Sequence, residues 1–146
     1  MSRQRFFVCV VSLALVACIA CGSGSRQIQS LSVSPSSADA QNYPDGRVPF
    51  VATGYYNVAP MTVTPLPANW GAASEQVVNG VPVENPTTDV SVDTNGVAQC
   101  NTGATGTYAI GAWVPAPTEA ECNVIGGPFN FTTCPVIFNT AQLTCP

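Results

Sequence analysis

Acidic side chains are the main candidates for chemistry in this chain, because the sequence has no His and its four basic residues are all Arg. A Ser-His-Asp or Cys-His arrangement is therefore impossible. A glycosidase needs only two carboxyl groups about 5 to 10 Å apart. Glu119 with Glu121, or Asp89 with Asp93, would supply such a pair. These acids occupy expected turns and loops, where solvated carboxylates are the ordinary finding, so we expect no catalytic residue and no enzyme.

Two further groups of residues are compared with metal sites. The run from Asp93 to Gly96 resembles the start of a calcium loop, but no Glu follows at the spacing of an EF-hand, and a hairpin turn accounts for all four residues. Zinc sites use closely spaced pairs of cysteines. The cysteines after the leader are at least eleven positions apart, and they are Cys100, Cys122, Cys134 and Cys145. We therefore expect disulfides, with no metal and no cofactor.

The stretch from Asp89 to Val114 predicts three strands and two turns. Val90 and Val92 alternate with polar residues, and the turn that follows is rich in residues that accept positive φ, which indicates a hairpin. From Thr107 the alternation resumes. Its core face is predicted to hold Tyr108, Ile110 and Ala112. Trp113 then belongs to the opposite face, and we expect it to be exposed.

The remaining elements are short strands separated by Pro-rich and Gly-rich loops. The predicted strands are Leu31–Pro35, Val48–Tyr56 and Val136–Cys145. The predicted irregular segments are a loop over 36–44, an extended run over 59–68, a loop or weak hairpin over 75–88 and a long loop over 115–135. Trp70 is expected to point into the core, its commoner fate in a small β-domain. The full set of expected core residues is Leu31, Val33, Phe50, Ala52, Trp70, Val90, Val92, Tyr108, Ile110, Ala112 and Leu143. No convincing helical period appears after the leader.

Composition limits the classes of function. The 146 residues allow one domain of ordinary size, and only 8% of them are charged. Without the two leader arginines, the chain has two Arg against eight acidic residues, a net charge of about −6. An acidic surface of this kind does not bind the phosphate backbone of nucleic acids, so we expect no nucleic-acid partner. Many small polar residues with 46% hydrophobic residues are typical of an exported β-protein.

Residues 1–20 have the features of an export signal. Arg3 and Arg5 precede an apolar run from Phe6 to Ala20, which is short for a membrane span and is followed by small and polar residues. The segment resembles bacterial lipoprotein signal peptides, in which a Cys after a small residue becomes acylated. Residues 21–30 then form a flexible tether to the domain at 31–146.

Two cysteines compete for the lipid. Leu15 stands three positions before Cys18, as the lipobox prefers, whereas Cys21 is followed directly by a Gly-Ser linker. Acylation of Cys21 leaves four cysteines to pair, so parity favours Cys21. An ordinary cleaved signal without lipid is the alternative. With Gly22 rather than Asp after the lipidated Cys, the resemblance implies an outer membrane if the cell is Gram-negative.

The order of these motifs resembles the bacterial immunoglobulin-like domain, group 2, which also occurs in intimin-like and invasin-like surface proteins. The segments that carry the resemblance are LSVSPSSA (31–38), VPFVATGYY (48–56), Trp70, VSVDTNGVAQ (90–99), GTYAIGAW (106–113) and NTAQLTC (139–145). They cover nearly the whole chain after the leader, but the loops 75–88 and 115–135 are longer than the family's. The resemblance implies a Greek-key sandwich of two antiparallel sheets, with Tyr108 at the position of the tyrosine corner.

In such a sandwich the strand from Thr107 pairs antiparallel with the last strand, so Cys145 lies near Cys100. Cys122 and Cys134 would close a local loop within the long connection. We therefore predict the disulfides Cys100–Cys145 and Cys122–Cys134.

The function that follows is a non-catalytic cell-envelope lipoprotein with an Ig-like module that serves as a spacer, adhesion or assembly component. Its partners would be the membrane, through the lipid anchor, and a protein or glycan at the cell surface. The alternative is a small glycan- or ligand-binding module with exposed aromatic side chains, for which Trp113 and Tyr55 are the candidate binding residues.

Overall fold

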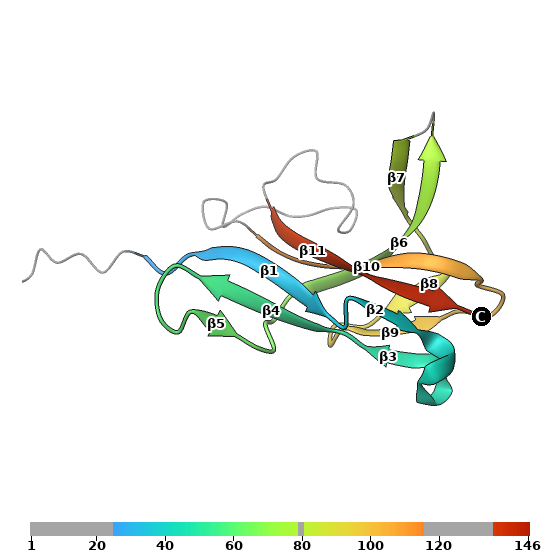
Figure 1. Cartoon of the computed structure of the whole chain (residues 1–146), viewed down its shortest axis with the longest axis horizontal. Coiled ribbons are helices and arrows are strands. Elements are labelled where there is room, and N and C mark those ends of the chain that lie inside the picture. Colours follow the sequence, from blue (N-terminus) through green and yellow to red (C-terminus); the bar gives the residue numbers. More distant parts are fainter. Residues whose placement is uncertain (1–24, 79–80, 116–135) are drawn as a thin grey trace, which may run out of the picture.

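The structure is a computed structural model and describes residues 25–78, 81–115 and 136–146. The described chain is nearly all β and forms a sandwich of strands around one core, as the sequence predicted (Figure 1). The predicted signal segment, Cys18 and Cys21, and the pair Cys122 and Cys134 all lie outside the described residues.

One side of the sandwich is a five-stranded sheet with β10 in the middle. Its order is β2 (Ser37–Asp39), β11 (Val136–Cys145), β10 (Gly106–Pro115), β6 (Asn69–Val78) and β7 (Val81–Pro86). Strand β2 pairs parallel with β11, and the other pairs are antiparallel. The predicted pairing of the last two strands is confirmed.

The other side consists of two three-stranded pieces. The first has the order β1 (Ile28–Ser34), β4 (Val51–Tyr56) and β5 (Thr62–Val63), and the second has β3 (Arg47–Pro49), β9 (Val97–Cys100) and β8 (Val90–Val92). Two single turns of 3₁₀ helix, η1 (Ala40–Asn42) and η2 (Pro44–Gly46), connect β2 to β3. Strand β1 begins at Ile28, so it includes the end of the segment that the sequence assigned to the tether.

The predicted strand 48–56 is divided in two, and this corrects the sequence analysis. Pro49 has no N–H for a ladder, and the N–H of Phe50 donates to Gly96 O at 2.9 Å. The chain therefore leaves β9 at this point and continues as β4 beside β1. The predicted loop 36–44 is also wrong in part, because it contains β2. The segment 75–88 adopts the hairpin alternative, with β6 paired to β7.

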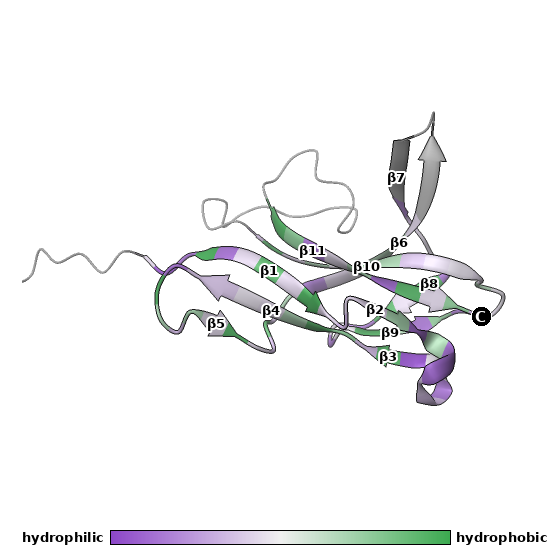
Figure 2. Ribbon diagram, in the orientation of Figure 1, coloured by the Kyte–Doolittle hydropathy of each residue, from purple (hydrophilic) through white to green (hydrophobic). Residues whose placement is uncertain are grey.

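The core lies between the two sides and takes residues from both. The sequence predicted eleven core residues. Nine of them are buried in one cluster, namely Leu31, Val33, Phe50, Ala52, Val90, Tyr108, Ile110, Ala112 and Leu143. Trp70 and Val92 are partly buried and pack against that cluster. Figure 2 shows the alternation of apolar and polar residues along β1 and β11 that places one face of each strand inward.

A disulfide joins the two sides at the end where the chain terminates. Cys100 ends β9 and Cys145 ends β11, and their Cα atoms are 5.8 Å apart. The predicted pairing of these two cysteines is confirmed. Figure 1 shows that the start of β1 and the connection from β4 to β5 lie at the opposite end of an elongated domain.

Candidate functional site

Asp89 and Asp93, the two acidic residues of the stretch from Asp89 to Val114, both have structural partners. The hydroxyl of Tyr108 donates to Asp89 Oδ2 at 3.3 Å and to Thr105 O at 3.2 Å. Burial raises the pKa of this hydroxyl, and the negative charge of Asp89 raises it further. The contact ties the start of β10 to the segment before β8. This arrangement accounts for Asp89 without a catalytic role.

Asp93 organises the turn between β8 and β9. Its Oδ1 accepts hydrogen bonds from the N–H of Asn95 at 2.8 Å and of Val97 at 2.9 Å. The hydrogen bond from Val97 is the main reason that the pKa of Asp93 lies below its usual value, and Asn95 and the charge of Arg47 lower it further. The predicted hairpin is confirmed, and the carboxylate stays ionised at neutral pH.

Trp70 lies at the start of β6 and packs against this turn. Gly96 has φ +81°, and a Cβ built on it would lie 2.8 Å from Trp70 Cζ2 and 2.5 Å from Phe50 O. Only glycine combines this backbone conformation with so close an approach. The turn and the indole therefore hold each other in place. Trp70 is half-buried, so its prediction as a core anchor holds for one part of the ring only.

A hollow of about 460 Å³ opens on one side of the indole. Its walls are the Pro-rich segment after β5 on one side and the β8–β9 turn on the other. The lining residues include Phe50, Ala52, Pro65, Leu66, Pro67, Ala68, Trp70, Thr94 and Asn95. A second hollow of about 210 Å³ is lined by Ala68, Asn69, Trp70, Val92, Asp93, Thr94 and Trp113.

The two hollows share Ala68, Trp70 and Thr94, and we call them together the Trp70 groove. Its lining is mainly apolar and includes the indole, and Asp93 and Asn95 add a carboxylate and an amide. A small ligand with an apolar face and several hydroxyl groups suits this combination, because its ring can stack on the indole and its hydroxyls can bond to the two polar side chains.

Trp113 corrects the prediction of an exposed binding residue, because only 6% of its surface is exposed. The alternation assigned its face correctly, since Trp113 is not part of the main core cluster. However, β10 is the middle strand of the sheet, and Trp113 is flanked by Asn69 on β6 and Phe138 on β11. Its buried indole Nε1 has no hydrogen-bond partner among the described residues. Trp113 thus lines the groove as a buried residue and does not offer an exposed ring on which a ligand could stack.

Tyr55 is 43% exposed, as a binding residue should be. Its hydroxyl lies 3.3 Å from Ser32 Oγ on the neighbouring strand β1. Tyr55 and Trp113 belong to different sheets, and Tyr55 does not line the Trp70 groove. The two predicted binding residues therefore do not form one site.

The sequence analysis did not identify the groove. Two features of the sequence could have indicated it. One is the pair of prolines that flank Leu66, just before an isolated Trp, and the other is a turn whose glycine leaves room for that Trp to pack against it. Their proximity depends on the pairing of distant strands.

A second feature, which we call the N-terminal clasp, fixes Ser25 to Ile28 to the connection between β4 and β5. The guanidinium of Arg26 lies 3.8 Å from the ring centre of Tyr56 and donates to Pro60 O at 2.6 Å. Asn57 accepts from Gln27 N at 2.7 Å through Oδ1 and donates its backbone N–H to Gln27 O at 3.1 Å. The point where the chain joins the sandwich is therefore fixed to one end of the domain.

Comparison with protein-family models, with curated proteins and with solved structures returned no match to this chain. The resemblance to the group 2 bacterial immunoglobulin-like domain therefore remains a prediction. Over the ranges that the structure describes, no helix has the length and apolarity to cross a membrane. In the same ranges, no three or more His, Cys, Asp or Glu side chains gather as metal ligands would.

Proposed function

We propose that this chain is a cell-envelope lipoprotein whose non-catalytic Ig-like module acts as a spacer, adhesion or assembly component. The observation that carries the proposal is the N-terminal clasp. It anchors the segment after the expected lipid site to one end of an elongated sandwich. A domain held by one end presents its other end to partners away from the membrane.

Tether length supports the same arrangement. Five residue steps separate Cys21 from Arg26, and an extended chain of that length spans at most roughly 18 Å. Each ten-residue strand of the sandwich is longer than this, at about 33 Å. The end with the clasp is thus the end that a lipid on Cys21 would hold near the bilayer.

Strand order supports an Ig-like Greek key. Ig-like sandwiches combine a sheet of strands A, B, E and D with a sheet of G, F and C, to which C′ is added in the variable type. If β3 and β4 count as one interrupted strand B, the pairs β1–β4, β3–β9 and β9–β8 match the first order, and β11, β10, β6 and β7 match the second, with β2 and β5 as additional strands. The hydrogen bond from Tyr108 to Thr105 O, three residues upstream, has the geometry of a tyrosine corner.

A non-catalytic role agrees with the contacts of Asp89 and Asp93, whereas the other acid pair that the sequence offered for chemistry, Glu119 and Glu121, lies outside the described residues. Asp89 accepts from Tyr108, and Asp93 accepts two backbone N–H groups within its turn. Both carboxylates stabilise connections between strands.

Detergent-phase partitioning of the protein from its membrane fraction tests the anchor. We expect the wild type and Cys18→Ser to enter the detergent phase, and Cys21→Ser to stay in the aqueous phase. Loss of partitioning in Cys18→Ser alone would move the anchor to Cys18. A wild type that stays in the aqueous phase would overturn the lipoprotein assignment.

The Trp70 groove favours a second candidate function, the binding of a small glycan or similar ligand. A ligand that stacks on Trp70 would change its fluorescence. Asp93 would accept hydrogen bonds from the ligand's hydroxyls, and Asn95 would accept or donate them. Titration with a panel of soluble glycans measures this, with Trp70→Phe as the variant that should lose the response. Constant emission across the panel would exclude glycan binding and leave the structural role.

A further inference from the structure

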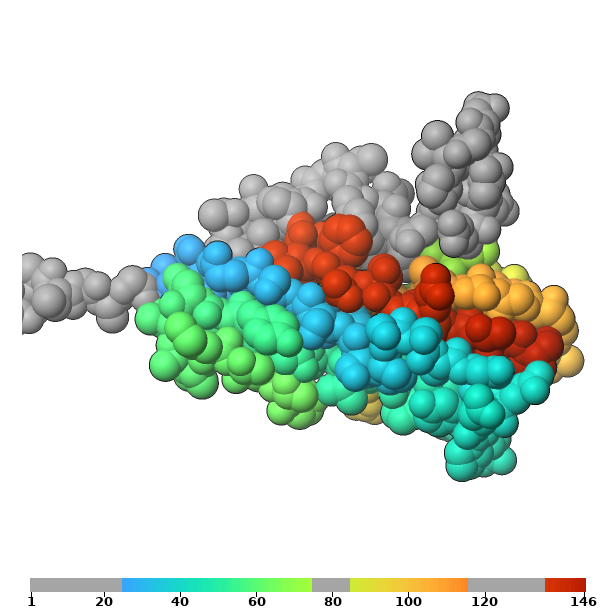
Figure 3. Space-filling view, viewed as in Figure 1, coloured from blue at the N-terminus to red at the C-terminus, as the bar shows by residue number. Residues whose placement is uncertain are grey.

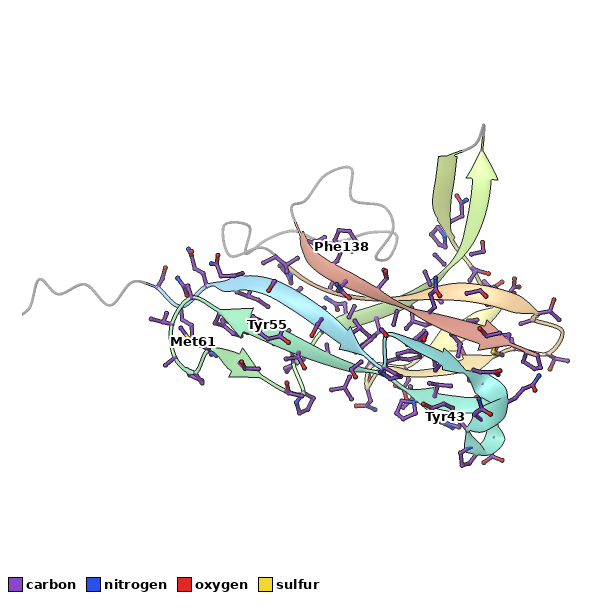
Figure 4. The ribbon with its side chains drawn as sticks, viewed as in Figure 1. Tyr43, Tyr55, Met61 and Phe138 are labelled. Atoms are coloured by element: carbon purple, nitrogen blue, oxygen red, sulfur yellow. A yellow bond between two sulfur atoms is a disulfide. The ribbon has the colours of Figure 1, made fainter. Side chains whose placement is uncertain are left out.

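The end of the domain that carries the clasp also carries exposed apolar side chains. Met61 is 63% exposed and Val58 is 40% exposed, and both belong to the connection between β4 and β5. Tyr55, 43% exposed, lies opposite Thr62, the residue that follows Met61, in the β4–β5 pair. Figure 4 shows Met61 at this end, with Tyr55 on the neighbouring strand. We call Arg26, Tyr55, Val58 and Met61 the tip.

The described segments at the tip lack the acidic residues that the rest of the chain contains. The segments that build this end, 25–34 and 51–66, contain no Asp and no Glu, and Arg26 is their one charged residue. The chain as a whole has eight acidic residues against four basic ones. Asp39 caps η1 and Asp45 lies within η2, at the end where the chain terminates. Of these described segments, those that carry the tip are therefore repelled less by an anionic surface than the segments around η1 and η2 are.

The contacts of Arg26 leave part of its guanidinium available. One face lies over the ring of Tyr56, and Nη2 donates to Pro60 O, but the side chain remains exposed. A guanidinium with free N–H groups is well suited to lipid phosphates. Tyrosine and apolar side chains next to a cation are the composition of surfaces that lie at the interface between headgroups and acyl chains.

We propose that the tip contacts the phospholipid surface to which the chain is tethered. Met61 and Val58 enter the boundary between headgroups and acyl chains, Tyr55 lies at headgroup level, and Arg26 bonds to lipid phosphate. This inference rests on the proposed lipid anchor, because a tether of five residue steps from Cys21 keeps the tip within roughly 18 Å of the bilayer. Figure 3 shows that the start of β1 and the β4–β5 region form one end of the domain. The contact fixes the orientation of the sandwich, with the end that holds the disulfide directed away from the membrane.

Hydrogen exchange of the purified full chain in vesicles of phosphatidylcholine and phosphatidylglycerol tests the contact. In the described part of the chain, no backbone hydrogen bond holds the N–H groups of Val58 and Ala59, so without lipid they should exchange freely. Contact with the bilayer should slow their exchange at least about tenfold. The variant with Val58→Ser and Met61→Ser should lose this protection. The matched control is Val51→Ser, because Val51 is also an exposed valine on this sheet, at 37%, but lies outside the tip, and it should keep the protection.

Two readouts separate this proposal from the lipid anchor. The mass of the N-terminal peptide from the same preparation reports acylation, and a chain without acyl groups overturns the anchor. Free exchange at Val58 and Ala59 in vesicles overturns the membrane contact of the tip, whatever the mass. Protection that persists in the variant with Val58→Ser and Met61→Ser also overturns it, because the apolar side chains would then not be its cause.

Discussion

Gly96 offers a sharp test of how the β8–β9 turn supports the Trp70 groove. An alanine there would adopt φ +81°, a left-handed conformation that costs an L-residue roughly 1–2 kcal/mol. Its Cβ would also lie 2.5 Å from Phe50 O and 2.8 Å from Trp70 Cζ2. Relief of those contacts must displace the indole or the hydrogen bond from Phe50 N to Gly96 O, at about 1–3 kcal/mol more. We expect Gly96→Ala to lower the free energy of unfolding by about 2–5 kcal/mol in total.

Gly103 provides the matched control. It has φ +87°, but a Cβ there would meet nothing within 4 Å. Gly103→Ala therefore has the cost of the backbone conformation without the steric contact. The difference between the free energies of unfolding of the two variants, measured in urea, gives the cost of the contact at Gly96. We expect Gly96→Ala to be less stable than Gly103→Ala by about 1–3 kcal/mol, with a change in Trp fluorescence of the folded state. Equal stabilities and unchanged fluorescence would refute the account of Trp70 packing on the turn.

Three further predictions concern the disulfide, Tyr108 and Asp93. Cys100→Ala with Cys145→Ala should cost about 4 kcal/mol in urea unfolding, because the bridge spans 45 residues of the chain, and a loss below about 1 kcal/mol would contradict the entropic account. Because the pKa of Tyr108 is raised in the folded state, its contribution to stability is complete below the ordinary value of 10.0 and is lost as the pH rises through the folded value. Above pH 10, the melting temperature of the wild type should therefore fall by more than that of Tyr108→Phe. Because the pKa of Asp93 is lowered in the folded state, its contribution to stability is present above the ordinary value of 3.8 and is lost as the pH falls through the folded value. In a plot of stability against pH, Asp93→Asn should therefore lose less stability on the acid side than the wild type. Equal losses in the two proteins would count against the hydrogen bonds of the turn as the cause.

Local pattern was sufficient for much of the fold. Strand β11 begins and ends at the predicted residues, the β8–β9 hairpin follows from the run Asp93 to Gly96, and the alternation from Leu31 and Phe50 identified the core. The pairing of the last two strands then placed Cys100 beside Cys145. These features depend on periodicity and turn chemistry, which a short window of sequence contains.

Features that depend on distant neighbours were not predictable in this way. Trp113 lies on the outer face that alternation assigns to it, but its burial depends on β6 and β11, which flank it. The break at Phe50 depends on two distant partners, because β3 pairs with β9, as far as the hydrogen bond from Phe50 to Gly96, and β4 then pairs with β1. The clasp likewise joins Arg26 to Pro60, and nothing in either local sequence indicates the other.

Mass spectrometry of the mature N-terminal peptide is the most direct test of the envelope lipoprotein. The account predicts a chain that begins at Cys21 and carries the mass of a diacylglyceryl group. An acylated Cys18 would lengthen the tether by three residues and keep the anchor. An unmodified chain that begins at Gly22 or Ser23 would contradict the central claim.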